Sequence, residues 1–180
     1  MNTVSFKVKL SQGEEFDIDM IDDVTEIALT ELFITDIDIS PISACKGLEQ
    51  LHLSSNHLTE LNLAPLSKCP KLQLLGLYGN QLTNLDLSPL SECSEFQGLD
   101  LSDNQISTLD ISPLTNCSKF KYFYLTNNPI DRLDVSAFFS HPNLEVLELD
   151  STLELIADAA LEGSIPDSVL SNFADRISYK

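Results

Sequence analysis

The chain has 180 residues, 43% of them hydrophobic, so it can bury a continuous core as one domain. Ten lysines and arginines stand against 28 aspartates and glutamates, which gives a formal charge of -18. Nucleic acids and anionic membranes bind positive charge, so this balance excludes both as expected partners. It favours a protein partner with a basic or mixed-charge surface, although the charge also serves solubility.

Residues 1–23 alternate between apolar and polar side chains. Val4, Phe6 and Val8 share one face of an extended segment, and a second alternating run follows a turn at residues 11–15. This pattern predicts a β-hairpin, which we expect to cap the apolar end of the domain that follows. It differs from the continuous apolar run of a signal peptide, so we expect a cytoplasmic protein. The acidic residues of the second run lack the glycine and spacing of a calcium loop, so no metal site is predicted.

Residues 24–152 repeat one pattern, in units that begin at Val24, Leu48, Leu72, Phe96, Phe120 and Leu144. Successive starts are 24 residues apart, and the first unit is the most degenerate. Within a unit, apolar residues recur at positions 1, 4, 6, 11, 14, 16 and 19. The alternation in Leu75-Gly76-Leu77 predicts a short strand, which cannot bury its apolar side alone. Stacked coils can, so the repeat predicts a solenoid with one parallel sheet.

Asparagine recurs at position 9 of the four regular units, as Asn56, Asn80, Asn104 and Asn128. The chain turns inward there, where peptide groups lose their water. An asparagine amide both donates and accepts, so we expect these side chains to bind peptide groups of their own and neighbouring coils.

The second half of most units contains Ser-Pro, as in Ser40-Pro41, Ser88-Pro89 and Ser112-Pro113. Serine is a good helix N-cap and proline suits the first helical position, so we expect one short helical or 3₁₀ turn per coil. The aspartate column, with Asp86 and Asp110 among its members, is interpreted as structural because it is so regular.

The pattern LxxLxLxxNxL resembles that of the leucine-rich repeat family, and it covers residues 24 to about 150. The phrase LDLSPLSEC is similar to the convex segment of internalin-type repeats, with two more residues per unit. The resemblance implies an α/β fold: a right-handed solenoid of about six coils with a concave parallel sheet. It also implies a monomeric protein-interaction module without cofactors. The alternative is a secreted or surface-attached recognition protein of the internalin kind.

The four cysteines all stand at position 22, as Cys45, Cys69, Cys93 and Cys117, and His141 continues the column. A disulfide framework would scatter its cysteines, so we expect buried free thiols, which fit a reducing cytosol. One ligand per coil in a straight line does not form a tetrahedral metal site.

Residues 153–180 depart from the repeat. Leu153 to Leu161 has a helical composition, and a capping box at Ser164 precedes apolar residues at helical spacing up to Ile177. We predict a C-terminal helical cap. The alternative is an exposed amphipathic helix that binds a partner.

Side chains beside the buried strand positions face solvent on the concave sheet. Apolar or aromatic residues occur there where stacking does not require them: Leu74, Tyr78, Tyr122, Tyr124 and Val146. Acidic residues border them, and the predicted partner-binding site also includes a histidine: Asp100, Asp103, Glu148, Asp150 and His52. Gly76 and Gly98 should leave a shallow depression. Aromatic residues within a polar rim are typical of a protein-binding hot spot.

The histidines suggest no catalytic site. A hydrolase built from His52 and Asp100 can be drawn, but no nucleophile, base and orienting group recur together at a strand end. We therefore predict a protein without enzymatic activity.

Overall fold

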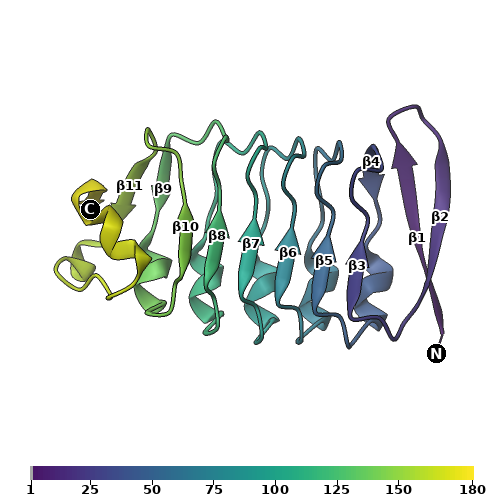
Figure 1. The fold of residues 1–180 in the computed structure, drawn as a ribbon, viewed down its shortest axis with the longest axis horizontal. Coiled ribbons are helices and arrows are strands. Elements are labelled where there is room, and N and C mark those ends of the chain that lie inside the picture. Colours follow the sequence, from purple (N-terminus) through teal and green to yellow (C-terminus); the bar gives the residue numbers. More distant parts are fainter. Residues whose placement is uncertain (1) are drawn as a thin grey trace.

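The structure is a computed structural model that describes residues 2–180. Six short strands form a parallel sheet in the order β10-β8-β7-β6-β5-β3. They are β3 (Glu26–Ala28), β5 (Gln50–His52), β6 (Leu74–Gly76), β7 (Gly98–Asp100), β8 (Tyr122–Tyr124) and β10 (Val146–Glu148). Each residue pairs with the residue 24 positions away, as Leu75 does with Leu99. The predicted solenoid of six coils is confirmed (Figure 1).

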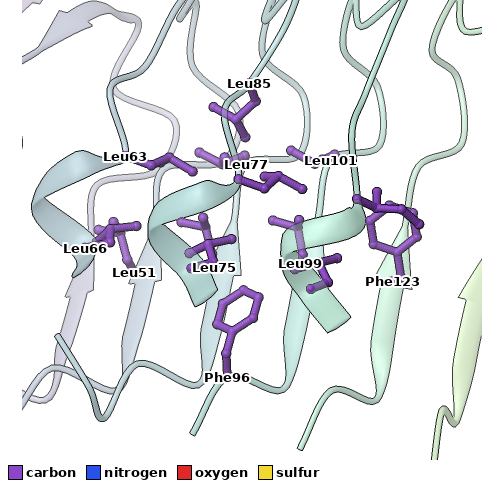
Figure 2. Close-up of a cluster of buried hydrophobic side chains, with 14 of the residues drawn as sticks. Leu51, Leu63, Leu66, Leu75, Leu77, Leu85, Phe96, Leu99, Leu101 and Phe123 are labelled. Atoms are coloured by element: carbon purple, nitrogen blue, oxygen red, sulfur yellow. The ribbon is translucent and has the colours of Figure 1, made fainter. Parts of the chain in front are cut away.

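One continuous apolar core runs through the stack. The middle residue of every concave strand points into it, and Leu51, Leu75 and Leu99 are each 1% exposed. Figure 2 shows these leucines side by side in successive coils, with Phe123 continuing the row and Phe96 packed next to it. Each coil thus covers the apolar side of its neighbour, as the period of the sequence requires.

A 3₁₀ helix closes the convex side of five coils: η1 (Ser40–Ala44), η2 (Ala64–Lys68), η3 (Ser88–Glu92), η4 (Ser112–Asn116) and η5 (Ser136–Ser140). The short turns were predicted, but the assignment of serine as the N-cap was wrong. Ser88 lies inside η3, and its peptide N–H is bound by the carboxylate of Asp86 at 2.9 Å. Asp38, Asp110 and Asp134 make the equivalent bond in η1, η4 and η5, and Asn62 makes it to Ala64 N–H in η2, so the side chain two residues before each turn fixes its start. Donation from Ser88 lowers the pKa of Asp86.

The asparagine column binds coil to coil, as predicted. Asn104 is 2% exposed, and its Oδ1 accepts from the peptide N–H of Leu82 at 3.0 Å in the preceding coil. Its Nδ2 donates to the carbonyl oxygens of Leu77 and Leu101, each at 3.0 Å. Asn56, Asn80 and Asn128 make the same contacts.

The cysteine column is fully buried, and all four thiols are free, as predicted. Cys93 Sγ donates to the carbonyl oxygen of Leu66 at 3.4 Å, one coil back. In the fifth coil His141 makes the matching bond from Nε2 to the carbonyl oxygen of Leu114 at 3.0 Å. Burial raises the pKa of Cys93 to about 12, so its thiol stays protonated.

Position 8 of the repeat adopts a left-handed backbone, which the sequence analysis did not foresee. Glu31, Ser55, Asp103 and Asn127 have φ between 54° and 58°, and Gly79 has φ 66°. This conformation costs an ordinary side chain about 1–2 kcal/mol, and only glycine adopts it freely. The chain needs it to leave the concave strand and turn toward the asparagine.

The N-terminal hairpin joins the convex side of the first coil. Strand β1 (Thr3–Leu10) pairs antiparallel with β2 (Glu15–Ile21) and on its other edge with β4 (Ile34–Ile37). Its apolar residues Val4, Phe6 and Val8 are buried against the first coil. The hairpin therefore covers the open end of the core, although it does not extend the concave sheet.

The C-terminal segment differs from the prediction, and the expected helix over residues 153–161 was wrong. Residues Glu154–Ala157 form strand β11, which pairs parallel with β9 (Arg132–Asp134) and β12 (Ile177–Tyr179). Peptide groups of the fifth coil require this strand, since Val135 N–H donates to the carbonyl oxygen of Ile156 at 2.8 Å. Hydrogen bonding to the fifth coil therefore outweighs the helical propensity of this segment.

Two 3₁₀ segments accompany these strands, η6 (Ala159–Leu161) and η7 (Val169–Arg176). The cap of η7 is Ser168, whose hydroxyl accepts from Leu170 N–H at 3.3 Å, so the capping box expected at Ser164 was wrong. Arg176 donates to the carbonyl oxygens of Asp150 and Leu153, both at 2.9 Å, and so ties η7 to the last coil.

Candidate functional site

A hollow of about 370 Å³ opens on the concave face across β5, β6, β7 and β8. It lies over the two glycines whose missing side chains predicted a depression. Its lining residues are His52, Ser54, Leu74, Leu75, Gly76, Gly98, Leu99, Asp100, Tyr122 and Tyr124. The hollow thus gathers five of the predicted site residues from four successive coils.

The glycines allow the surrounding side chains to lean inward. A Cβ added to Gly98 would lie 2.8 Å from Leu74 Cδ2 and 3.3 Å from the Cβ of Tyr122. A Cβ at Gly76 would lie 3.0 Å from His52 Nδ1 and 3.2 Å from the hydroxyl of Ser54. The glycines therefore form the floor of the hollow, and the neighbouring coils supply its walls.

The hollow is apolar and aromatic in the middle and acidic at its border. Leu74, Tyr122 and Tyr124 are half-buried, which leaves part of each for a ligand. Burial raises the pKa of Tyr124, and the negative charges of Glu148 and Asp100 raise it further. These carboxylates disfavour an anionic group of a ligand in the hollow and favour a cationic one.

Tyr122 is held in place by a pair of charges that the sequence analysis missed. Its hydroxyl donates to Glu145 Oε2 at 3.0 Å, while Lys121 Nζ lies 2.7 Å from Glu145 Oε1. The hydrogen bond to Glu145 raises the pKa of Tyr122, and donation from Lys121 and Tyr122 lowers the pKa of Glu145. This pair could have been predicted from position 2 of the repeat, where long polar side chains, among them Lys121 and Glu145, lie side by side in successive coils.

The remaining predicted residues surround the hollow. Val146 and Glu148 lie on β10, in register with Tyr122 and Tyr124. Tyr78 lies two residues after the end of β6, is 43% exposed and does not line the hollow.

Two of the acidic residues also hold the turn of the fifth coil. Asp103 Oδ1 accepts from Asn127 Nδ2 at 3.1 Å, and Asp150 Oδ2 accepts from the peptide N–H of Asn127 at 2.9 Å. Their charge faces solvent, but their positions are fixed by the stack. Ser54, which was not among the predicted site residues, lines the wall beside His52.

Residues 2–180 offer neither a metal centre nor a membrane-spanning helix. No cluster of three or more histidine, cysteine, aspartate or glutamate side chains has a geometry that could hold a metal ion there. In the same range, no helix has the length and apolar composition needed to cross a membrane.

The stacked strands, asparagine column and concave hollow define a repeat solenoid of the kind that generally recognises proteins. The leucine rich repeat family matches residues 23–82 and 94–153, which exceed half of the chain. The chain therefore belongs to this family.

Solved structures carry the same fold. An internalin of Listeria monocytogenes is 28% identical with a TM-score of 0.61, over 75% of this chain and 36% of the internalin. A leucine-rich repeat protein of Leptospira interrogans is 22% identical with a TM-score of 0.66, over 88% of this chain and 37% of that one.

A third match is the ectodomain of a plant membrane receptor kinase of Arabidopsis thaliana, solved in complex with Casparian strip integrity factor 2. It is 25% identical with a TM-score of 0.67, over 81% of this chain and 17% of the receptor. The chain spans less than two fifths of the length of each of these three proteins. Among curated protein sequences, none matches this chain.

Proposed function

We propose that this chain is a non-enzymatic recognition module that binds a partner protein on its concave face. An apolar or aromatic anchor of the partner enters the hollow over Gly76 and Gly98, and basic groups around that anchor meet the acidic border. The single observation that carries the proposal is the hollow itself, with its tyrosine walls and glycine floor.

Tyrosine suits this role because it offers a large contact area at a small entropic cost. Tyr122 is already oriented by Glu145, so little further ordering is needed on binding. The acidic residues Asp100 and Glu148 steer a basic partner from a distance, an effect that salt screens beyond about 8 Å at physiological ionic strength.

The test compares capture by the wild type with capture by variants that alter only the hollow. Gly76→Leu should fill it, because the two nearest atoms to the new Cβ belong to the side chains of His52 and Ser54, which can move aside, and the nearest backbone atom is 3.9 Å away. Tyr124→Ala removes a wall, and Tyr179→Ala is the matched control on β12 at the C-terminal end. Partners captured from a lysate of the source cells are identified and then titrated as purified proteins.

The proposal expects one protein to bind the wild type and the Tyr179→Ala variant but neither hollow variant. Its affinity should fall at high salt, and Asp100→Asn should reduce that salt dependence while keeping the carbonyl that accepts from Ser102 N–H. Equal affinity for all variants would refute the concave site. Gly76→Leu, Tyr124→Ala and Asp100→Asn lie on the sheet surface and should melt close to the wild type, whereas Tyr179→Ala should melt somewhat lower because Tyr179 packs against the core. Loss of capture by the hollow variants alone therefore cannot come from lost stability.

We also propose that the chain acts as a monomer in the cytoplasm. The free, buried thiols are compatible with a reducing compartment. The rival proposal is a secreted recognition protein, and the similarity to an internalin favours it. Fractionation of the source cells with an antibody against the chain separates the two, since recovery in the culture medium would refute a cytoplasmic role.

A further inference from the structure

The outer edge of β2 is an unpaired strand edge at the N-terminal end of the solenoid. Strand β2 lies outermost in Figure 1, and within residues 2–180 its only partner is β1. Leu10 N–H donates to the carbonyl oxygen of Glu14, and Asp22 N–H donates to that of Asn2, both at 2.8 Å. Since antiparallel strands alternate, the even-numbered residues of β2 bond to β1.

The odd-numbered residues of β2 therefore direct their peptide groups outward. These are Glu15, Asp17, Asp19 and Ile21, and their side chains are all exposed. Such a row of free N–H and C=O groups is a template for one more strand. Phe16 is 43% exposed, and Ile18 and Met20 are half-buried, so the apolar side of β2 is also incompletely covered. One added strand would satisfy the peptide row and cover these side chains.

Charge alternates in sign from strand to strand across this small sheet. Lys9 of β1 lies between Glu15 of β2 and Asp36 of β4, and its Nζ is 3.9 Å from Glu15. Lys7 lies opposite Asp17, and its carbonyl oxygen accepts from the N–H of Asp38 on the other side. The order across the sheet is thus acidic, basic, acidic, and β2 presents the last acidic row to solvent.

This alternation argues against a second copy of β2 as the occupant. Two copies paired antiparallel about Ile18 would place Asp17 opposite Asp19 of the other chain, and like charges directly opposite destabilise a pair. A strand with lysine or arginine at every second position and apolar residues between them would continue both the charge order and the apolar row. Strand β1 itself has this pattern in residues 6–10, FKVKL.

We propose that the outer edge of β2 binds an extended segment of a partner protein in which basic and apolar residues alternate. The segment pairs with the peptide groups of Asp17 and Asp19, places its basic side chains beside the two carboxylates, and packs its apolar side chains on Ile18. This surface is separate from the concave hollow, so both can be occupied at once.

The test uses a peptide of alternating valine and lysine, as long as β2 (7 residues), with blocked ends. Amide hydrogen exchange of the intact chain is followed by NMR with and without the peptide. The outward amides of Asp17 and Asp19 should exchange about tenfold more slowly with peptide bound, while those of Ile18 and Met20, already bonded to β1, should not change.

Two controls separate backbone pairing from simple attraction of charge. A valine and glutamate peptide, and a lysine peptide N-methylated on its facing edge, should each bind at least about tenfold more weakly. Asp19→Lys should weaken the lysine peptide and strengthen the glutamate peptide. This residue lies opposite Ser5, so the substitution leaves the hairpin intact.

Three outcomes would overturn the proposal. The first is unchanged exchange at Asp17 and Asp19 in saturating peptide. The second is perturbation confined to the concave residues around Asp100. The third is protection of the outward amides by self-association alone, seen by raising the protein concentration without peptide, because that would make a second copy the occupant.

Discussion

His141 should make the stability of this solenoid depend on pH just below neutrality. Its ring is 1% exposed, Nε2 is bound to the carbonyl oxygen of Leu114, and Nδ1 has no partner within residues 2–180. Protonation would put a charge and an unbonded N–H into the core. Burial therefore lowers the pKa of His141 below its ordinary 6.5, and the bond to Leu114 opposes this only in part.

The sign follows from proton uptake. Below pH 6.5 the unfolded chain binds a proton at this histidine that the folded chain still refuses, so acid favours unfolding. The contribution of the neutral His141 ring to the free energy of unfolding is complete above pH 6.5, and it falls by up to about 1.4 kcal/mol per pH unit as the pH drops. The loss stops growing once the pH reaches the lowered pKa of the folded state. Acid groups such as Asp86, whose pKa is also lowered, lose their contribution only near pH 4 and below.

The variant that isolates this effect is His141→Cys. Cysteine occupies position 22 in four other coils, and in three of them its thiol donates to a carbonyl oxygen of the preceding coil, so the bond is kept and the titrating ring is lost. The smaller side chain leaves a cavity beside Phe120, so the variant should be about 2 kcal/mol less stable at pH 7.5.

Urea unfolding of both proteins at pH 7.5, 6.5 and 5.5, at constant ionic strength, measures the difference in free energy. The difference should shrink by up to about 1 kcal/mol between pH 6.5 and 5.5, because only the wild type loses stability through this group. Subtraction cancels effects of net charge that both proteins share. A difference independent of pH would mean that His141 titrates alike in both states, and the reasoning from its burial would fail.

Three further predictions concern the ladders and the turn. Asn104→Ala should cost about 3 kcal/mol in urea unfolding, because the peptide N–H of Leu82 and two carbonyl groups lose their partner. Residues 31 and 79 both have positive φ, which favours glycine, so Glu31→Gly should raise the free energy of unfolding by about 1 kcal/mol and Gly79→Ala should lower it by a similar amount. Effects of the same sign for the two substitutions would contradict this. A thiol reagent should label none of the four cysteines in the native chain and all of them after denaturation.

Much of this fold could be predicted because each repeated residue type has one structural role that follows from its own chemistry. The asparagine column was interpreted from the donor and acceptor capacity of one side chain, and Asn104 makes the expected contacts. The hollow was predicted from Gly76 and Gly98 by the same kind of reasoning, since a strand position without a side chain leaves space. The use of that hollow by a partner stays a prediction.

The ends of the chain were harder because no neighbour repeats their pattern. The sequence of Glu154–Ala157 favours a helix, but the peptide groups of β9 require a strand. The cap of each convex turn was assigned to the serine next to proline, whereas the aspartate two residues earlier accepts the bond. Both errors came from relying on local residue preference, because the contacts that decide these two segments exist only once the coils are stacked.

The period also explains why the concave face can change without loss of the core. Position 4 of each coil contacts the layers above and below it and is buried, so Leu75→Ala should cost about 2–5 kcal/mol. Position 5 lies on the concave surface of the sheet, where His52, Gly76, Asp100 and Tyr124 follow one another in register. Stacking of the coils requires neither the glycine at position 5 of the third coil nor the tyrosine at position 5 of the fifth coil. Gly76→Leu and Leu75→Ala, one residue apart, should therefore separate recognition from stability.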